Sequence, residues 1–105
     1  MRAIINRKRY DTDTATKIAF WSNGASYGDF NRCEESLYQT KGGAFFLCGE
    51  GGGLSKYACS IEGGRASGSG SEIIPLTQPE ALDWCEEHDQ GDAIEEHFAA
   101  EITDA

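Results

Sequence analysis

The sequence predicts an α+β domain, in which an antiparallel sheet of three to five strands is followed by two short C-terminal helices. Two observations predict this fold class. Residues 1–76 contain β-branched and aromatic runs separated by turn residues, which is typical of strands. Residues 77–103 instead space their apolar residues by three and four, which is typical of helices. At 105 residues the chain suits a single domain over 1–105, mainly β over 1–76 and helical over 77–103.

The predicted sheet region begins with a hairpin. Residues 3–5 and 8–10 flank Asn6-Arg7, which favours a tight turn. Residues 14–21 predict a third strand, because they are rich in β-branched and aromatic side chains and end at Ser22-Asn23-Gly24.

Four later segments complete the predicted β region. Residues 33–40 alternate imperfectly, with Cys33, Glu35, Leu37 and Gln39 on one face, and the apolar run 44–48 predicts a central buried strand. Residues 56–61 are a further candidate strand. Residues 62–71 are rich in glycine and serine and predict a flexible loop. Residues 72–76 predict a short extended segment at a sheet edge, because it contains Pro75.

Capping signals place the two helices. Thr77 and Glu80 fit a capping box that starts a helix running to about Asp89, with Ala81, Leu82, Cys85 and His88 on its sheet-facing stripe. Gly91 predicts the C-terminal cap, and the sequence from Asp92 to Glu95 repeats the capping-box pattern for a second helix. Ile94, Phe98 and Ile102 are spaced by four and predict one buried line on that helix.

Charge is distributed very unevenly along the chain. Residues 1–71 hold 9 basic and 7 acidic groups, a net charge of +2, whereas residues 72–105 hold 11 acidic groups and no Lys or Arg, which together give −9. A strongly acidic protein does not bind nucleic acid or an anionic membrane surface directly, because both require a basic face. A partner that is itself basic fits this charge.

The acidic residues of the two predicted helices are the candidate partner-binding site. Neighbours on one helix face repel one another unless something basic opposes them, and ordinary solvated helices mix both signs of charge. We expect this surface to compete with nucleic acid for a basic groove; a simply solvated surface is the alternative. The candidate residues are Glu80, Asp83, Glu86, Glu87, Asp89, Asp92, Glu95 and Glu96.

Motifs for catalysis and metal binding are weak. The glycine-rich run 49–53 lacks a following Gly-Lys-Ser/Thr and predicts a turn with positive φ rather than a phosphate cradle. Neither histidine has an obvious serine or cysteine nucleophile. The four cysteines form no Cys-x-x-Cys pair and predict reduced, mostly buried thiols; Cys85 and His88 share one helical turn, but zinc requires about four ligands. We therefore expect no enzymatic activity, no cofactor and no metal.

Aromatic side chains suggest a second contact surface. Those expected in the core are Phe20, Phe45, Phe46 and Phe98. Those that could anchor an interface are Tyr10, Trp21, Tyr27, Phe30, Tyr38, Tyr57 and Trp84. Packing is the commoner role for any single one of them.

Several segments resemble a family of small acidic proteins carried by bacterial mobile elements and prophages. The matching segments are residues 5–15 (INRKRYDTDTA), 35–38 (ESLY), 43–52 (GAFFLCGEGG), 55–58 (SKYA) and 73–77 (IIPLT). Proteins of this type and origin include anti-CRISPR proteins, several of which imitate DNA on a Cas surface. The resemblance implies a setting, but it defines no catalytic residue.

The resemblance and the charge asymmetry together predict a non-enzymatic anti-CRISPR protein. It would bind a basic, nucleic-acid-binding surface of a Cas effector through its helical carboxylates, as a mimic of DNA, in the cytoplasm of a bacterial host cell. The alternative is a small interaction or regulatory protein of a mobile element, antitoxin-like, that uses its sheet aromatics. A metal- or thiol-dependent activity at Cys85 and His88 is a third reading.

Overall fold

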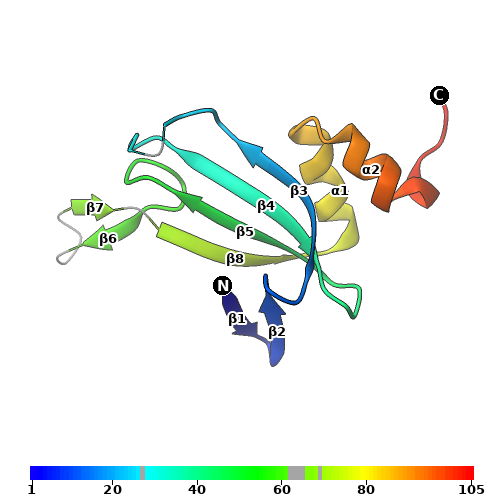
Figure 1. The fold of residues 1–105 in the computed structure, drawn as a ribbon, viewed down its shortest axis with the longest axis horizontal. Helices are drawn as coiled ribbons and strands as arrows, with labels where there is room; N and C mark the ends of the chain where they lie inside the picture. Colours follow the sequence, from blue (N-terminus) through cyan, green and yellow to red (C-terminus); the bar gives the residue numbers. More distant parts are fainter. Residues whose placement is uncertain (27, 62–65, 69) are drawn as a thin grey trace.

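The computed structural model describes residues 1–26, 28–61, 66–68 and 70–105, and it confirms the α+β fold (Figure 1). A four-stranded antiparallel sheet is flanked by two separate two-stranded sheets, and the helices follow at the C-terminal end. The strands are β1 (Arg2–Ile5), β2 (Lys8–Asp11), β3 (Thr16–Ser22), β4 (Cys33–Gln39), β5 (Phe45–Gly51), β6 (Cys59–Ile61), β7 (Ala66–Gly68) and β8 (Gly70–Leu76). The helices are α1 (Gln78–Glu87), α2 (Gly91–His97) and the short 3₁₀ helix η1 (Ala99–Glu101).

The central sheet has the strand order β3-β4-β5-β8, with every neighbouring pair antiparallel. The apolar run 44–48 therefore lies in an interior strand, as predicted, and β8, which contains Pro75, lies at the edge. Leu37, Leu47 and Ile74 lie side by side across β4, β5 and β8 on one face of the sheet. Phe46 is next to Leu47 in β5 and therefore points to the opposite face.

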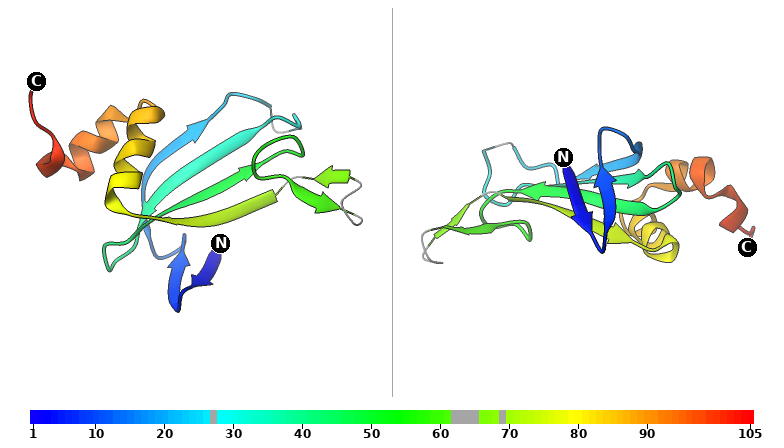
Figure 2. Two further views of the ribbon diagram at one scale, coloured as in Figure 1. Left: turned by 180° about the vertical axis from the view of Figure 1, so that it is seen from behind. Right: turned by 90° about the horizontal axis from the view of Figure 1, so that it is seen from below.

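Each face of the central sheet carries its own cover (Figure 2). On the Leu37 face, α1 contributes Trp84 and Cys85 to the larger core, α2 contributes Ala93, and Phe98 follows directly after α2. On the Phe46 face, the β1–β2 hairpin contributes Tyr10 to a smaller core that includes Phe46 and Ile73. The sheet is thus packed on both faces, by helices on one side and by the hairpin on the other.

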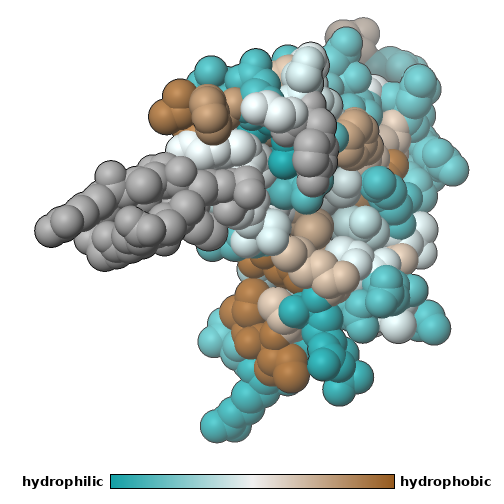
Figure 3. Space-filling model, turned by 60° about the vertical axis from the view of Figure 1, so that its left-hand side comes forward, coloured by the Kyte–Doolittle hydropathy of each residue, from teal (hydrophilic) through white to brown (hydrophobic). Residues whose placement is uncertain are grey.

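The N-terminal hairpin has the predicted turn. Asn6 and Arg7 both adopt positive φ, at 52° and 66°, as a two-residue type I′ turn requires. Tyr10 packs edge-on against Phe46, with ring centroids 5.6 Å apart, and fixes the hairpin to the sheet. Hydrophobic surface remains at the base of the molecule, over this hairpin (Figure 3), where Ile4 is 67 % exposed.

Helix α1 begins with the predicted capping box. The Thr77 hydroxyl accepts from the backbone N–H of Glu80, and the Glu80 carboxylate accepts from the backbone N–H of Thr77 at 2.8 Å. The prediction at the junction with α2 is wrong. Asp89, with φ of 54°, takes the left-handed conformation expected of Gly91, which instead begins α2. Gln90 rather than Asp92 is the N-cap, and it makes no side-chain capping bond.

The predicted buried line of α2 is also only partly correct. Phe98 is buried and packs on Phe45, with ring centroids 5.2 Å apart. The α-helix ends at His97 and a turn of 3₁₀ helix follows. Residues four apart therefore no longer lie on the same side of the chain after His97. Ile102 is consequently 43 % exposed.

Two strand predictions need correction. Residues 56–58 form a turn rather than a strand, and only β6 is extended in the predicted segment 56–61. The predicted flexible loop 62–71 contains β7 and the start of β8, because these residues pair with β6 and β5. The rest of that predicted loop, residues 62–65 and 69, lies outside the described residues.

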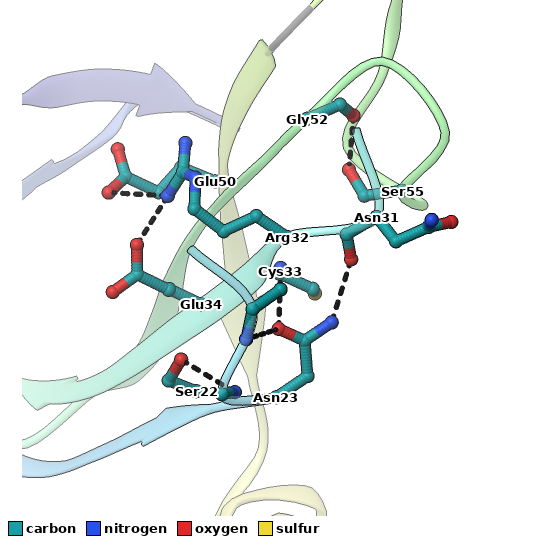
Figure 4. Close-up of polar contacts among 11 residues, drawn as sticks. Ser22, Asn23, Asn31, Arg32, Cys33, Glu34, Glu50, Gly52 and Ser55 are labelled. Carbon is teal, nitrogen blue, oxygen red and sulfur yellow. Dashed lines mark hydrogen bonds and ion pairs between the residues drawn. The ribbon is translucent and has the colours of Figure 1, made fainter. Parts of the chain in front are cut away.

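The predicted positive φ in the glycine-rich run 49–53 is not found: among the described glycines, positive φ occurs at Gly24 and Gly43. Glycines in this run instead allow neighbouring atoms to lie where a Cβ would stand. A Cβ on Gly52 would lie 2.5 Å from the backbone oxygen of Asp29, and one on Gly51 would lie 2.5 Å from that of Arg32. The two loops therefore pack backbone to backbone. Arg32 adds ion pairs with Glu34 and Glu50 at this junction (Figure 4).

Most aromatic residues are structural. Tyr10, Tyr57 and Trp84, which were interface candidates, are buried. Phe20, expected in the core, is 45 % exposed and lies under the Lys17 ammonium group. Phe30 is 68 % exposed and remains an interface candidate, Trp21 and Tyr38 are half-buried, and Tyr27 lies outside the described residues.

Candidate functional site

The eight candidate carboxylates all lie exposed at the helical end of the molecule, and we call this surface the acidic face. Helix α1 carries Glu80, Asp83, Glu86 and Glu87, the turn after it carries Asp89, and α2 carries Asp92, Glu95 and Glu96. The buried side of α1 holds Ala81, Trp84 and Cys85, so the carboxylates occupy the side that faces solvent. The structure therefore brings the predicted site residues together on one end of the fold (Figure 1).

The acidic face has little internal compensation of charge. Within the described part of the chain, none of its carboxylates pairs with a Lys or Arg; Glu96 lies 3.8 Å from the Nε2 atom of His97. Glu80 alone has a clear structural role, since its hydrogen bonds with Thr77 hold the pKa of its carboxyl below the ordinary value. The other carboxylates repel their neighbours and are free to meet a cationic surface.

A second polar site surrounds the buried carboxylate of Glu35 between the sheet and α1, and we call it the Glu35 cluster: Glu35, Lys56, Tyr57, Trp84 and His88. The side chain of Glu35 has no exposed surface. Its carboxylate accepts hydrogen bonds from the Tyr57 hydroxyl and from Trp84 Nε1, the latter at 3.1 Å. Lys56 Nζ lies 2.9 Å away, and His88 Nε2 lies 3.5 Å away. Lys56, Tyr57 and Trp84 thus donate to the buried carboxylate.

The hydrogen bonds of the Glu35 cluster control its ionisation. Burial raises the pKa of Glu35, but the hydrogen bonds from Lys56, Tyr57 and Trp84 outweigh burial and hold its pKa below the ordinary 4.5. Burial and the bond to Glu35 raise the pKa of Tyr57 far above that of a free tyrosine. The stable state is therefore a charged Glu35 and a neutral Tyr57 that donates to it.

The Glu35 cluster joins three segments of the chain. Glu35 comes from β4, Lys56 and Tyr57 from the turn after β5, and Trp84 from α1. The His88 ring stacks on Trp84 and lies edge-on to Trp21, with centroids 4.7 Å and 4.6 Å apart, and its Nδ1 donates to the Trp84 carbonyl at 2.7 Å. These contacts fix the position of α1 on the sheet, and with it the acidic face.

A catalytic role does not follow from this geometry. A shallow pocket beside the cluster is lined by Lys56, Tyr57, Ala58, Ser71 and Glu72, but the Tyr57 hydroxyl points away from it, to Glu35. Since the Glu35 carboxylate has no exposed surface, a substrate in that pocket would not contact it. The Glu35 cluster is best explained as a structural feature that holds α1 and the turn after β5 against β4.

The three cysteines whose side chains the structure describes lie in environments that suppress thiolate chemistry. Cys85 is buried in the larger core, and Cys33 and Cys48 are half-buried free thiols. Burial raises the pKa of all three above the ordinary 9.0. Among the described residues, no group of three His, Cys, Asp or Glu side chains is placed to hold a metal ion. Cys85 and His88 therefore have no third such side chain beside them in the described part of the chain.

Sequence reasoning found the acidic face but missed the Glu35 cluster. A signal was present, because the predicted alternation of residues 33–40 put Glu35 on the same face as Leu37. A carboxylate on the apolar face of a strand requires a donor from elsewhere. The donors Tyr57 and Trp84 lie 22 and 49 positions further along the chain, and no local pattern links them to Glu35.

Acid should weaken the fold through Glu35. Because the folded pKa of Glu35 lies below its unfolded value, the charged carboxylate contributes stability above about pH 4.5, and this contribution is lost as the pH falls through the folded pKa. We expect the free energy of unfolding, measured with urea, to fall between about pH 6 and about pH 3. In Glu35→Gln the same titration should give a shallower slope; an equal slope would contradict the assignment.

Comparison with known proteins gave no match: no family model, no curated protein and no solved structure matches the chain. Within the described residues, no helix is long and apolar enough to cross a membrane.

Proposed function

We propose that this protein is a non-enzymatic inhibitor of a CRISPR–Cas effector, acting in the cytoplasm of a bacterial host cell. Its acidic face would occupy a basic surface of the effector that normally receives nucleic acid. The observation that carries the proposal is the set of eight exposed carboxylates on α1, α2 and the turn between them. The choice of a Cas effector rests on the resemblance to proteins of mobile elements.

The charge of the acidic face supports binding by electrostatic attraction. Carboxylates three or four residues apart on a helix stand about 5–6 Å from one another, a dense row of charge like that of nucleic-acid phosphates. Such a surface associates rapidly with a basic groove, and salt weakens the association because it screens exposed charges. We therefore expect inhibition to fall as salt rises.

Charge reversal on the acidic face tests the proposal. We expect the variant with Asp83→Lys, Glu87→Lys, Glu95→Lys and Glu96→Lys to lose inhibition of the effector and capture by it. Glu80 is left unchanged because it caps α1. Each of the four reversals adds 2 to the net charge of −9, giving −1. The measurement is cleavage or target binding by candidate Cas effectors, after circular dichroism has shown that the variant folds.

A matched pair separates the site from the net charge. The reversals Asp83→Lys and Glu87→Lys change the charge as much as Asp13→Lys and Glu72→Lys, which replace exposed carboxylates outside the acidic face. Only the first pair should weaken inhibition. Full inhibition by the four-fold variant would overturn the proposal.

One observation favours the alternative, a small regulatory protein of a mobile element that binds through apolar side chains. Phe30 and Leu54 are 68 % and 70 % exposed, and the backbone N–H of Leu54 donates to the Phe30 carbonyl at 2.7 Å. This apolar pair lies on the loops before β4 and after β5. The alternative requires that Phe30→Ser with Leu54→Ser abolish partner binding, with little effect of salt, whereas the leading proposal leaves that variant active.

A further inference from the structure

A surface pocket of mixed character borders the acidic face at Glu86. It is formed where α1, α2 and the segment after η1 meet. Its aliphatic walls are Leu82, Ile94 and Ile102, and its polar groups include Glu86, Glu101 and Thr103. Phe98 anchors the chain immediately before η1 in the core, and this leaves Ile102 beside the pocket and 43 % exposed.

We propose that this pocket receives an arginine side chain of the protein partner. The inference rests on the proposed function, because the arginine belongs to the same basic surface. The methylene groups of arginine would pack on Leu82, Ile94 and Ile102, and its guanidinium group would meet Glu86 and Glu101. The pocket would thus add a specific anchor to a surface that otherwise attracts by charge.

Other occupants fit the pocket less well. An anion would be repelled by Glu86 and Glu101, and a purely apolar side chain would desolvate these carboxylates without giving them a partner. A lysine has the aliphatic stem but only a compact ammonium group. The planar guanidinium carries five N–H donors and is more weakly hydrated, so it can bond to two carboxylates at a lower cost in desolvation.

Titration with short peptides tests the pocket directly. The probes are acetyl-Ala-Arg-Ala-amide and the same peptide with citrulline, which keeps the shape and removes the charge, or with lysine. We expect the arginine peptide to shift backbone amide NMR signals of the pocket residues, and to bind about tenfold more tightly than the citrulline peptide. Equal binding of the arginine and lysine peptides, with shifts spread evenly to Asp83 and Glu95, would overturn the inference.

Single substitutions connect the pocket to inhibition. Ile102→Ser and Glu101→Gln should each weaken arginine-peptide binding and inhibition of the effector by about tenfold, whereas Ile4→Ser, on the N-terminal hairpin, should change neither. If Ile102→Ser and Glu101→Gln inhibit fully while the four-fold charge reversal does not, the arginine pocket is wrong and the proposed function stands. If the four-fold reversal inhibits fully, the proposed function itself is wrong.

Discussion

Glu35→Ala is expected to lower the free energy of unfolding by about 3–5 kcal/mol. The substitution leaves the Tyr57 hydroxyl and Trp84 Nε1 buried without their acceptor, because both donate to the Glu35 carboxylate. It also opens a cavity between β4 and α1. Such a loss is a large part of the roughly 5–15 kcal/mol that holds a typical domain together. Lys56 contributes less to the penalty, since its exposed ammonium group can be solvated by water.

Urea unfolding, monitored by fluorescence, measures this loss of stability. Two further variants serve as comparisons. Glu35→Gln keeps one acceptor oxygen but places an NH2 donor where the second oxygen stood, so only one of the two buried donors keeps its acceptor. Its stability should therefore lie between that of wild type and that of Glu35→Ala. Asp83→Ala removes a carboxylate on the solvent side of α1 and should leave stability almost unchanged. A loss below about 1 kcal/mol in Glu35→Ala would show that the Glu35 cluster does not tie α1 to the sheet.

The elements that could be predicted are those set by neighbouring residues. Asn6-Arg7 specifies its turn, because both positions need positive φ and asparagine tolerates it. Thr77 and Glu80 specify the start of α1, because each satisfies a backbone N–H that the helix leaves open. The apolar run before Gly49 specifies an interior strand, since both of its faces are covered.

The elements that could not be predicted are set by distant contacts. Residues 56–58 have the composition of a strand, but they turn so that Lys56 and Tyr57 reach Glu35. The glycines after β5 are explained by the backbone of residues 29–32, which packs against them. Asp89, rather than Gly91 two residues later, takes the left-handed conformation at the end of α1. In the first two cases tertiary packing outweighs a local preference of about 1 kcal/mol, whereas the end of α1 is closed locally, with the backbone N–H of Gln90 donating to the Cys85 carbonyl at 2.8 Å.

The candidate site divides in the same way. Exposure of the acidic face followed from helical periodicity, since the apolar stripe of α1 fixes which side meets solvent. The pocket at Ile102 could not be predicted from helical periodicity, because it depends on the change from α-helix to 3₁₀ helix between α2 and η1. Burial of Glu35 requires donors from two other segments, and sequence spacing alone does not bring them together.

Gly49→Ala is expected to destabilise the fold by about 2–5 kcal/mol, although it adds only one methyl group. Gly49 is the β5 partner of Glu35, and the Tyr57 ring fills the space where its side chain would stand. A Cβ there would lie 2.0 Å from Cζ and 2.2 Å from the hydroxyl oxygen of Tyr57. The ring must therefore move, and Glu35 loses a buried donor. Gly42→Ala is the control, because its nearest neighbour would be the Thr40 hydroxyl at 3.9 Å.

A double-mutant cycle distinguishes this steric conflict from a general preference for glycine in the strand. Tyr57→Ala removes the ring that the new methyl group would meet, so Gly49→Ala should cost much less in that background than in wild type. Urea unfolding of the four proteins gives the coupling energy. Costs that simply add would show that Gly49 is required for the backbone of β5 alone. A strong coupling would show that the absent side chain makes room for Tyr57, and through Tyr57 for the buried charge on which α1 and the acidic face depend.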